Sequence, residues 1–272
     1  MNPVETSFLK RFAKLCGDGY RKGWHERNGG NLSYRMNEEE VNEVKDSLNT
    51  STPWIKIGAS VPTLANEYFL VKCTGCYMMN MESDPESNCG IIKVDEKGEN
   101  YRIEWGMKGG NHPTSELPSH LMNLAVVKAR TNGKYRIVYH CHPANVIALT
   151  FVLPLDNKTW SHKMWEMMTE CPIIFPAGVG VVPWMVPGGE EIALATSKLM
   201  ETYDVAIWAH HGIFVTGETF DSTWGLIDTV DKSADILVKV LSMGGIKQTI
   251  TDDDFRALQK PYHVTVNPEF LD

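Results

Sequence analysis

The stretch YHCHPAN places two histidines, His140 and His142, one residue apart at the end of an apolar run. In an extended strand alternate side chains share a face, so these imidazoles point the same way while Cys141 points away. Two imidazoles on the same face of a strand can bind one metal ion. The alternative is a pair of partly exposed histidines at a strand end, since histidine is commonly half buried. Other residues must decide between these interpretations.

A third candidate ligand lies in WAHHGIF, which we predict to be part of a strand over VAIWAHHGIFVTG. His210 and His211 would then lie on opposite faces, and only one of them could join a given site. We favour His211 because Gly212 follows it and lets the backbone pass close to the site. Three neutral imidazoles leave a fourth coordination position open, as in catalytic rather than structural zinc sites.

A carboxylate and an anion cradle accompany the histidines. Glu116 lies in PTSE at the predicted start of a helix, where Thr114 and Ser115 add hydroxyl groups and helix N-terminal amides. The motif NGGN, residues 28–31, offers asparagine amides and exposed backbone N–H groups in a tight turn. Each motif has a structural alternative, an ordinary turn for NGGN and a helix cap for PTSE. Taken with the histidines, they indicate a phosphate site beside a metal.

These groups need a scaffold, and the hydrophobic pattern predicts a single domain over residues 1–272 without repeats or linkers. We predict helices over residues 5–21, over 113–131 with Thr114 or Ser115 as cap, from about Asn145, over 189–202, and over 222–243. Strands are predicted after RNGG and at EYFLVKC, GIIKVDEKG, YRIEW and KYRIVYHCH, whereas residues 38–66 are predicted to be irregular. The fold class is therefore α/β (α+β), with a central mixed, largely antiparallel sheet covered by helices on both faces.

Composition limits the classes of function. The chain has 272 residues, 43% hydrophobic and 22% charged, with a formal net charge of -8 and a pI near 5.6. Basic residues never cluster, which argues against a nucleic-acid or anionic-membrane surface. Without a signal-peptide core or an apolar run near the ~20 residues that span a bilayer, we expect a cytoplasmic protein. The six scattered cysteines are expected to be free thiols, and a redox or zinc role is disfavoured for the C-x-x-C of Cys73 and Cys76.

The motifs N-G-G-N, P-T-S-E, H-C-H-P and H-H-G follow one another in this order at wide spacing. Longer stretches accompany them, among them KGWHERNGGNLSYR, TECPIIFPAGVGVVPWMVPGGEEI and WGLIDTVDKSADILVKVLSMGGIKQTI. In these motifs the chain resembles the class II aldolase and epimerase family. The resemblance extends from about Gly23 to Thr251 and implies one class II aldolase-like catalytic domain.

The resemblance implies a role for each candidate residue. One Zn²⁺ per subunit would be bound by His140, His142 and His211, with Glu116 as the catalytic acid or base. Glu170, in TECP, matches a position that reaches a neighbouring subunit's active site, which implies a homotetramer with active sites near subunit interfaces. The substrate phosphate would lie among Asn28, Gly30, Asn31, Thr74, Gly75, Thr114 and Ser115. The loop Thr74-Gly75-Cys76 departs from close relatives, which are expected to have a Ser-Gly-Lys-like sequence. Thr74 stands in place of the serine and Cys76 in place of the basic residue.

The implied activity is a step of rhamnose degradation, the reversible retro-aldol cleavage of L-rhamnulose 1-phosphate to dihydroxyacetone phosphate and L-lactaldehyde. Zinc would polarise the carbonyl and stabilise the enediolate, without a lysine Schiff base. The expected partner is a small sugar phosphate, with no nucleic acid and no membrane. Alternatives within the family are a fuculose-phosphate aldolase and a pentulose-phosphate 4-epimerase. A non-enzymatic adducin-like scaffold would lack the ligands, and a zinc hydrolase would need the same three histidines.

Overall fold

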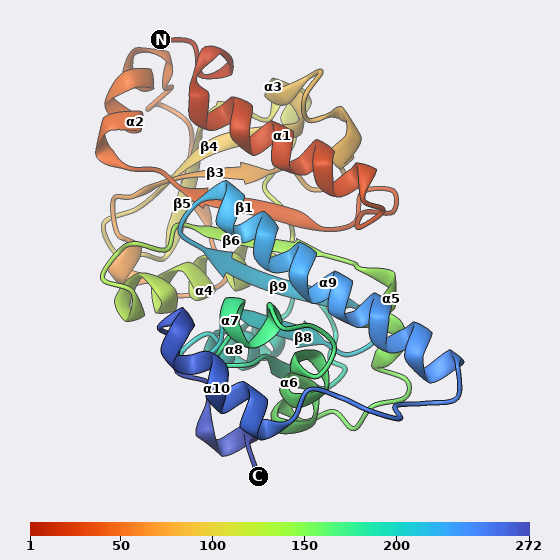
Figure 1. Ribbon diagram of the computed structural model, residues 1–272. Helices are drawn as coiled ribbons and strands as arrows, with labels where there is room; N and C mark the ends of the chain where they lie inside the picture. The colour runs from red at the N-terminus through yellow and green to blue at the C-terminus, as the bar shows by residue number, and fades with distance from the viewer.

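A nine-stranded sheet runs through the centre of the protein, whose computed structural model describes residues 1–272 (Figure 1). The strands are β1 (Asn31–Arg35), β2 (Ile55–Lys56), β3 (Tyr68–Lys72), β4 (Cys89–Val94), β5 (Asn100–Gly106), β6 (Ile137–Cys141), β7 (Gly180–Val182), β8 (Val205–Trp208) and β9 (Gly212–Gly217). They lie in the order β2-β5-β4-β3-β1-β6-β9-β8-β7. All neighbouring pairs are antiparallel except β7 with β8, so the mixed, largely antiparallel sheet predicted from the sequence is confirmed.

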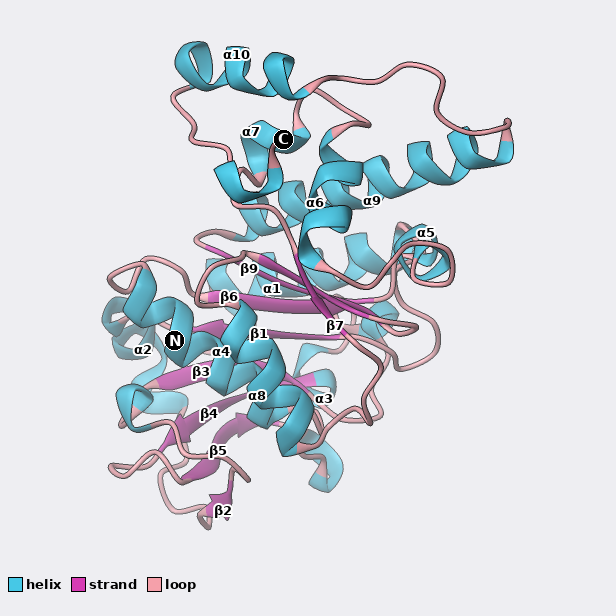
Figure 2. Cartoon of the chain, turned by 90° about the horizontal axis from the view of Figure 1, so that it is seen from below, coloured by secondary structure: helices cyan, strands magenta, loops and turns pink.

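Helices cover both faces of this sheet, as Figures 1 and 2 show from two directions. They are α1 (Ser7–Arg21), α2 (Glu38–Val44), α3 (Pro85–Asn88), α4 (Leu117–Arg130), α5 (Ala144–Leu149), α6 (Asn157–Trp165), α7 (Cys171–Ile174), α8 (Glu190–Leu199), α9 (Phe220–Ser242) and α10 (Asp252–Tyr262). One hydrophobic core lies between the sheet and α1, α5 and α9, and a second lies between the opposite face and α4 and α8. None of the helices combines the length and the apolar character needed to cross a membrane.

The alternation of side chains along β6 directs a histidine toward the face that α4 covers. Tyr139 belongs to the core under α1 and α9, whereas Val138 belongs to the core under α4. His140 shares the face of Val138 and stacks on Phe214 of β9, with ring centroids 4.3 Å apart. Asn31 of β1 is the register partner of His140. The sheet therefore sets an asparagine and a histidine side by side beneath the start of α4.

The segment between β1 and β3 is more regular than predicted. Residues 38–66 form α2, β2 and short 3₁₀ helices rather than an irregular stretch. Asn37 and Glu40 close a capping box at the start of α2, each side chain accepting from the other's backbone N–H. Val44 is the single buried residue of α2, so the segment lacks the apolar period from which a helix is predicted. Helices α6 and α10 are likewise additions to the predicted set.

The start of α4 also differs from the prediction, because Glu116 is its N-cap residue in place of Thr114 or Ser115. The backbone N–H of Thr114 donates to the carbonyl of Lys72 at 3.0 Å, which continues sheet-like pairing past the end of β3. The Thr114 hydroxyl accepts from the N–H of Glu116 at 3.3 Å, which forms a local turn. These contacts hold Thr114 outside the helix. The side chain of Glu116 makes no capping hydrogen bond and is left for other partners.

The predicted strand VAIWAHHGIFVTG is wrong in one respect, because it is a hairpin of two strands. β8 and β9 pair antiparallel, and the chain turns between Trp208 and Gly212. His210 takes the left-handed conformation, with φ of 61°, at this turn. His210 and His211 therefore do not project from opposite faces of one strand, and the turn aims their side chains in different directions.

Candidate metal and active site

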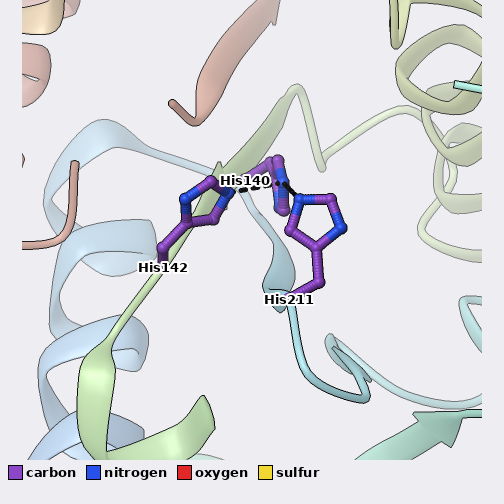
Figure 3. Close-up of side chains that lie close together, drawn as sticks. All are labelled: His140, His142 and His211. Atoms are coloured by element: carbon purple, nitrogen blue, oxygen red, sulfur yellow. Dashed lines mark hydrogen bonds between the residues drawn. The ribbon is translucent and has the colours of Figure 1, made fainter. Parts of the chain in front are cut away.

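Three imidazoles converge at one end of the sheet (Figure 3). His140 is near the end of β6, His142 follows that strand, and His211 lies in the β8–β9 turn. Nε2 of His140 lies 3.1 Å from Nε2 of His142 and 3.3 Å from Nε2 of His211. Two ligands at about 2.0–2.1 Å from a tetrahedral zinc ion lie about 3.3 Å apart. These two separations fit ligands of one metal ion, and the ligand atoms of all three histidines lie within 4.8 Å of one another.

The second nitrogen of two of these rings has its own partner. Nδ1 of His140 donates to the carbonyl of Ile213 at 2.9 Å, and Nδ1 of His142 donates to the carboxylate of Glu26 at 2.8 Å. These contacts keep the hydrogen on Nδ1, so the lone pair of Nε2 is available to coordinate a metal ion. Burial lowers the pKa of His140 well below its usual value and that of His211 to about 4, with a further lowering from neighbouring His142. Both rings are therefore neutral at pH 7, as metal ligands must be.

The hairpin turn explains why His211, and not His210, joins the cluster. Nδ1 of His210 lies 3.0 Å from the hydroxyl of Thr150, and its ring packs on Phe151, away from the triad. Gly212 makes close packing possible, because a Cβ atom there would lie 2.3 Å from the carbonyl oxygen of Cys141. The preference for His211 on account of its glycine neighbour thus agrees with the geometry.

Glu116 borders the histidines. Its Oε2 lies 3.6 Å from Nε2 of His140 and accepts from Nδ2 of Asn31 at 2.7 Å. The residue is 7% exposed, and this burial raises the pKa of its carboxyl, while the Asn31 hydrogen bond opposes the rise. A carboxylate that is buried, hydrogen bonded and adjacent to a metal position has the properties of a proton-transfer group.

A cavity of 210 Å³ joins these groups to the polar loops. Its lining holds every predicted site residue except Glu170: Asn28, Gly30, Asn31, Thr74, Gly75, Thr114, Ser115, Glu116, His140, His142 and His211. Apart from Pro187, its lining consists of polar residues and glycines. Loops distant in the sequence, NGGN, Thr74-Gly75 and Thr114-Ser115, thus meet around one polar space. Hydroxyl and amide donors facing a metal position suit an anionic, oxygen-rich molecule.

The Asn31 side chain differs from the other members of the predicted phosphate set. Both of its polar atoms are engaged within the protein, Nδ2 by Glu116 and Oδ1 by the imidazole of His120. Asn28, in contrast, is exposed. The two asparagines of NGGN therefore face different partners, and the Asn31 side chain is tied to the carboxylate of Glu116.

Three residues that the sequence analysis did not select support the site. Lys72 lines the cavity, is 2% exposed, and donates from Nζ to the carbonyls of Asn28 and Cys73 at 3.1 and 3.3 Å. His25 holds the NGGN loop through the carbonyl of Gly29 at 3.1 Å. Glu26 orients His142, as described above. One signal was present for Lys72, a charged residue at the end of the apolar strand YFLVK.

Glu170 lies apart from this cavity. It is exposed at the N-cap of the short helix α7 and is not among the lining residues. It has no partner among the ion pairs of the chain. Glu170 is therefore not part of the active site that one chain forms by itself.

Comparison with known proteins finds sequence similarity over nearly the whole chain. The family described as Class II Aldolase and Adducin N-terminal domain matches residues 10–238. A rhamnulose-1-phosphate aldolase of Mannheimia succiniciproducens is 46% identical over 264 residues, 97% of each chain. One from Klebsiella pneumoniae is 44% identical over 269 residues, 99% of this chain and 98% of the relative.

Solved structures share the fold. A sugar-phosphate aldolase from Thermotoga maritima superimposes with a TM-score of 0.75 at 27% identity, covering 88% of this chain and 96% of that one. An L-fuculose 1-phosphate aldolase at 18% identity gives a TM-score of 0.62, over 97% of this chain and all of that one, and supports the fold alone. The match to residues 10–238 and the full-length similarity to aldolases place this chain in the class II aldolase and adducin family.

Proposed function

We propose that this protein is a zinc-dependent aldolase that reversibly cleaves L-rhamnulose 1-phosphate to dihydroxyacetone phosphate and L-lactaldehyde. The observation that carries the proposal is the convergence of three imidazoles, the Glu116 carboxylate and three polar loops on one cavity of 210 Å³. The relatives that are 44% and 46% identical are named for this substrate, which supports the choice of sugar.

One zinc ion per chain would be held by His140, His142 and His211. The neutral rings of His140 and His211, the separations of the Nε2 atoms and the partners on Nδ1 of His140 and His142 support this assignment. When bound, the ion supplies a Lewis acid that polarises the substrate carbonyl and stabilises the charge that develops on its oxygen.

The phosphate would occupy the part of the cavity away from the histidines. Its proposed surroundings are Asn28, Gly30, Thr74, Gly75, Thr114 and Ser115. Lys72 is the one lysine or arginine among the lining residues and would supply the positive charge that a phosphate dianion requires. Because Lys72 also bonds the carbonyls of Asn28 and Cys73, it ties the two phosphate loops together.

Glu116 would transfer the proton to and from C3 of the substrate. In cleavage the Glu116 carboxylate takes the proton of the C4 hydroxyl, which becomes the aldehyde of L-lactaldehyde, while the electron pair of the C3–C4 bond passes to the dihydroxyacetone phosphate fragment. Glu116 then gives a proton to C3 of the resulting enediolate, and in the synthetic direction it removes that proton. Its position beside Nε2 of His140 supports this role.

The proposal includes a homotetramer in which Glu170 completes the active site of a neighbouring subunit. The exposure of Glu170 and its distance from the cavity of its own chain support this role, because a residue of that kind is available to another copy. We also place the enzyme in the cytoplasm, where its six free cysteines stay reduced.

The reaction is tested with zinc-loaded wild type and the Glu116→Gln variant. Wild type is expected to release dihydroxyacetone phosphate from L-rhamnulose 1-phosphate. With dihydroxyacetone phosphate alone, it should exchange one carbon-bound hydrogen for deuterium, as followed by NMR. Glu116→Gln should slow both processes on the order of 10²- to 10⁴-fold and retain its zinc. Neither exchange nor triose phosphate release by wild type would refute the aldolase, and wild-type exchange by Glu116→Gln would move the role to another residue.

A panel of substrates separates the alternatives. A fuculose-phosphate aldolase would prefer L-fuculose 1-phosphate, and a pentulose-phosphate 4-epimerase would interconvert pentulose 5-phosphates without releasing an aldehyde. A zinc hydrolase would release inorganic phosphate, and an adducin-like scaffold would do none of these. For the assembly, Glu170→Ala is expected to lower turnover with zinc content unchanged, and light scattering should give a tetramer. A fully active monomer would exclude the shared site.

A further inference from the structure

We propose that His120 is a positioning residue of the acid-base site, which holds Asn31 so that Asn31 holds the carboxylate of Glu116. This inference rests on the aldolase function proposed above. It assigns a role to a buried histidine that lies outside the cavity and is not one of the candidate metal ligands.

The three side chains form a continuous chain of hydrogen bonds. Nδ2 of Asn31 donates to Oε2 of Glu116 at 2.7 Å, and Oδ1 of the same amide pairs with Nε2 of His120. His120 is completely buried, and Asn31 and Glu116 are 5% and 7% exposed. Buried bonds of this kind are not exchanged for bonds to water, so each link fixes the orientation of the next.

The polarity of the chain follows from the two contacts of the Asn31 amide. Its NH₂ group donates to Oε2 of Glu116, and its oxygen is left to accept from His120. The Nε2 of His120 must then carry a hydrogen. Burial lowers the pKa of His120 to about 3, so the ring is neutral and has a single N–H, which it donates to Asn31. Without this donor the amide could turn over and set its oxygen against the carboxylate of Glu116.

Packing holds the imidazole in place. The ring of His120 packs against Phe214 with centroids 5.3 Å apart at 61°, and Phe214 also stacks on the ring of His140. His120 also lies on α4, one turn after the N-cap residue Glu116. The same helix and the same aromatic ring therefore align the acid-base residue, its positioning residue and a metal ligand.

The far side of the imidazole adds a second observation. Nδ1 of His120, the hydroxyl of Ser33 and both polar atoms of Asn123 are buried without a hydrogen-bond partner. Asn123 follows His120 by one helical turn, and Ser33 shares the sheet face of Asn31. Because Nδ1 of His120 has no partner within the protein, no contact of the fold draws the ring hydrogen away from Nε2, which donates to Asn31.

Two substitutions of His120 separate positioning from packing. In His120→Gln the side-chain NH₂ occupies the place of Nε2 and can still donate to Asn31. In His120→Asn the shorter amide reaches only the place of Nδ1, and the donor is lost. His120→Asn is expected to lower kcat for L-rhamnulose 1-phosphate on the order of 10- to 100-fold, with KM and zinc content close to wild type. His120→Gln should recover most of the loss.

A double variant tests whether His120 acts through Glu116. Adding His120→Asn to Glu116→Gln should cause little further loss of kcat, because the group that His120 positions is already disabled. The inference would be overturned if the fold-loss of kcat in the double variant equalled the product of the losses in the two single variants. Equal losses of kcat in His120→Asn and His120→Gln would also overturn it. Thermal unfolding of wild type and the four variants identifies any variant that fails to fold.

A crystal structure of His120→Asn gives a readout that does not depend on the substrate. The 2.7 Å contact between the Asn31 amide and Oε2 of Glu116 is expected to lengthen as the two side chains move apart, whereas His140, His142 and His211 should stay in place. Unchanged Asn31 and Glu116 would overturn the positioning role. If wild type fails to cleave L-rhamnulose 1-phosphate, the proposed function fails, and this structural comparison still decides the inference.

Discussion

His142, which follows β6, and Glu26, in the loop between α1 and β1, form a two-oxygen contact. Nδ1 of His142 lies 2.8 Å from Oε1 and 2.9 Å from Oε2 of the carboxylate. Glu26 is largely exposed, yet it turns the ring of His142 so that Nε2 faces His140. A carboxylate that accepts a hydrogen bond from Nδ1 of a ligand histidine orients the ring. It also makes Nε2 a more basic ligand for a metal ion.

Glu26→Ala is therefore expected to weaken zinc binding about 10- to 100-fold, and Glu26→Gln to have a smaller effect because it keeps an acceptor. Competition with a chromogenic chelator measures the affinity. Glu39→Ala, which removes an exposed carboxylate from α2, is the control and should bind zinc like wild type. Unchanged affinity in Glu26→Ala would remove Glu26 from the metal site.

His210 and His211 provide an internal comparison for the metal site, because they are neighbours and only His211 faces the triad. His211→Asn is expected to bind less than about a tenth of an equivalent of zinc and to lose activity, since two imidazoles remain. His210→Asn should keep about one equivalent per chain, because asparagine tolerates the left-handed backbone at this position. Elemental analysis after gel filtration measures both. Equal zinc content in the two variants would contradict the assignment.

The four histidines at positions 140, 142, 210 and 211 show which parts of the site could be predicted from the sequence. The shared face of His140 and His142 follows from strand alternation, a local rule, and the distances between their rings agree with it. The turn between β8 and β9 could not be predicted in this way, because WAHHGIF has no turn residue before Gly212 and reads as continuous strand. A histidine in the left-handed conformation makes the turn, and this is uncommon for a residue other than glycine.

Two supporting residues of the site were beyond prediction for another reason. Glu26 and His120 make their contacts with residues that are far away in the chain, such as the link of His120 to Asn31 across 89 positions, whereas Lys72 had a signal as a charged residue at the end of an apolar strand. No periodicity encodes such a contact, because it arises when sheet and helices pack. NGGN and PTSE were selected for their amide, hydroxyl and backbone N–H donors, whereas Thr74-Gly75 was implied only by the family resemblance. The fold brings all three loops to one cavity.

A pH-sensitive contact joins α6 to α10, outside the cavity. His162 pairs with Glu166 at 3.3 Å and with Asp252 at 2.7 Å. Glu166 also accepts from Lys163, and Asp252 accepts from the backbone N–H of Asp272. The hydrogen bond to Glu166, and then that to Asp252, raise the pKa of His162 above its usual 6.5, although partial burial opposes the rise. The charged imidazole thus stabilises the docking of α10.

Because the folded state binds this proton more tightly than the unfolded chain, the stabilisation is complete below about pH 6.5 and is lost as pH rises through the folded pKa. The difference in free energy of unfolding between wild type and His162→Gln should therefore be larger at about pH 6 than at about pH 9. Urea titrations at both pH values measure it. A difference that does not depend on pH, or that grows with pH, would show that His162 contributes by packing alone.

Lys72 carries a positive charge into a space without another lysine or arginine. Its ammonium group has three hydrogens, and the carbonyls of Asn28 and Cys73 accept two of them. One hydrogen is left for the cavity that Lys72 lines. Burial lowers the pKa of Lys72, and a bound phosphate dianion would favour the charged form again. The lysine should therefore contribute to binding of the phosphate and little to the bond-breaking step.

Lys72→Met keeps the length of the side chain and removes the charge. It is expected to raise KM for L-rhamnulose 1-phosphate about 10- to 100-fold, the range for a lost hydrogen bond to a charged group, and to change kcat less. Inhibition by inorganic phosphate should weaken in parallel, whereas slow cleavage of unphosphorylated L-rhamnulose should stay the same. Lys232→Met, at an exposed position of α9, controls for the change in net charge. A fall in kcat with KM and phosphate inhibition unchanged would place Lys72 in the chemical step and remove it from the phosphate site.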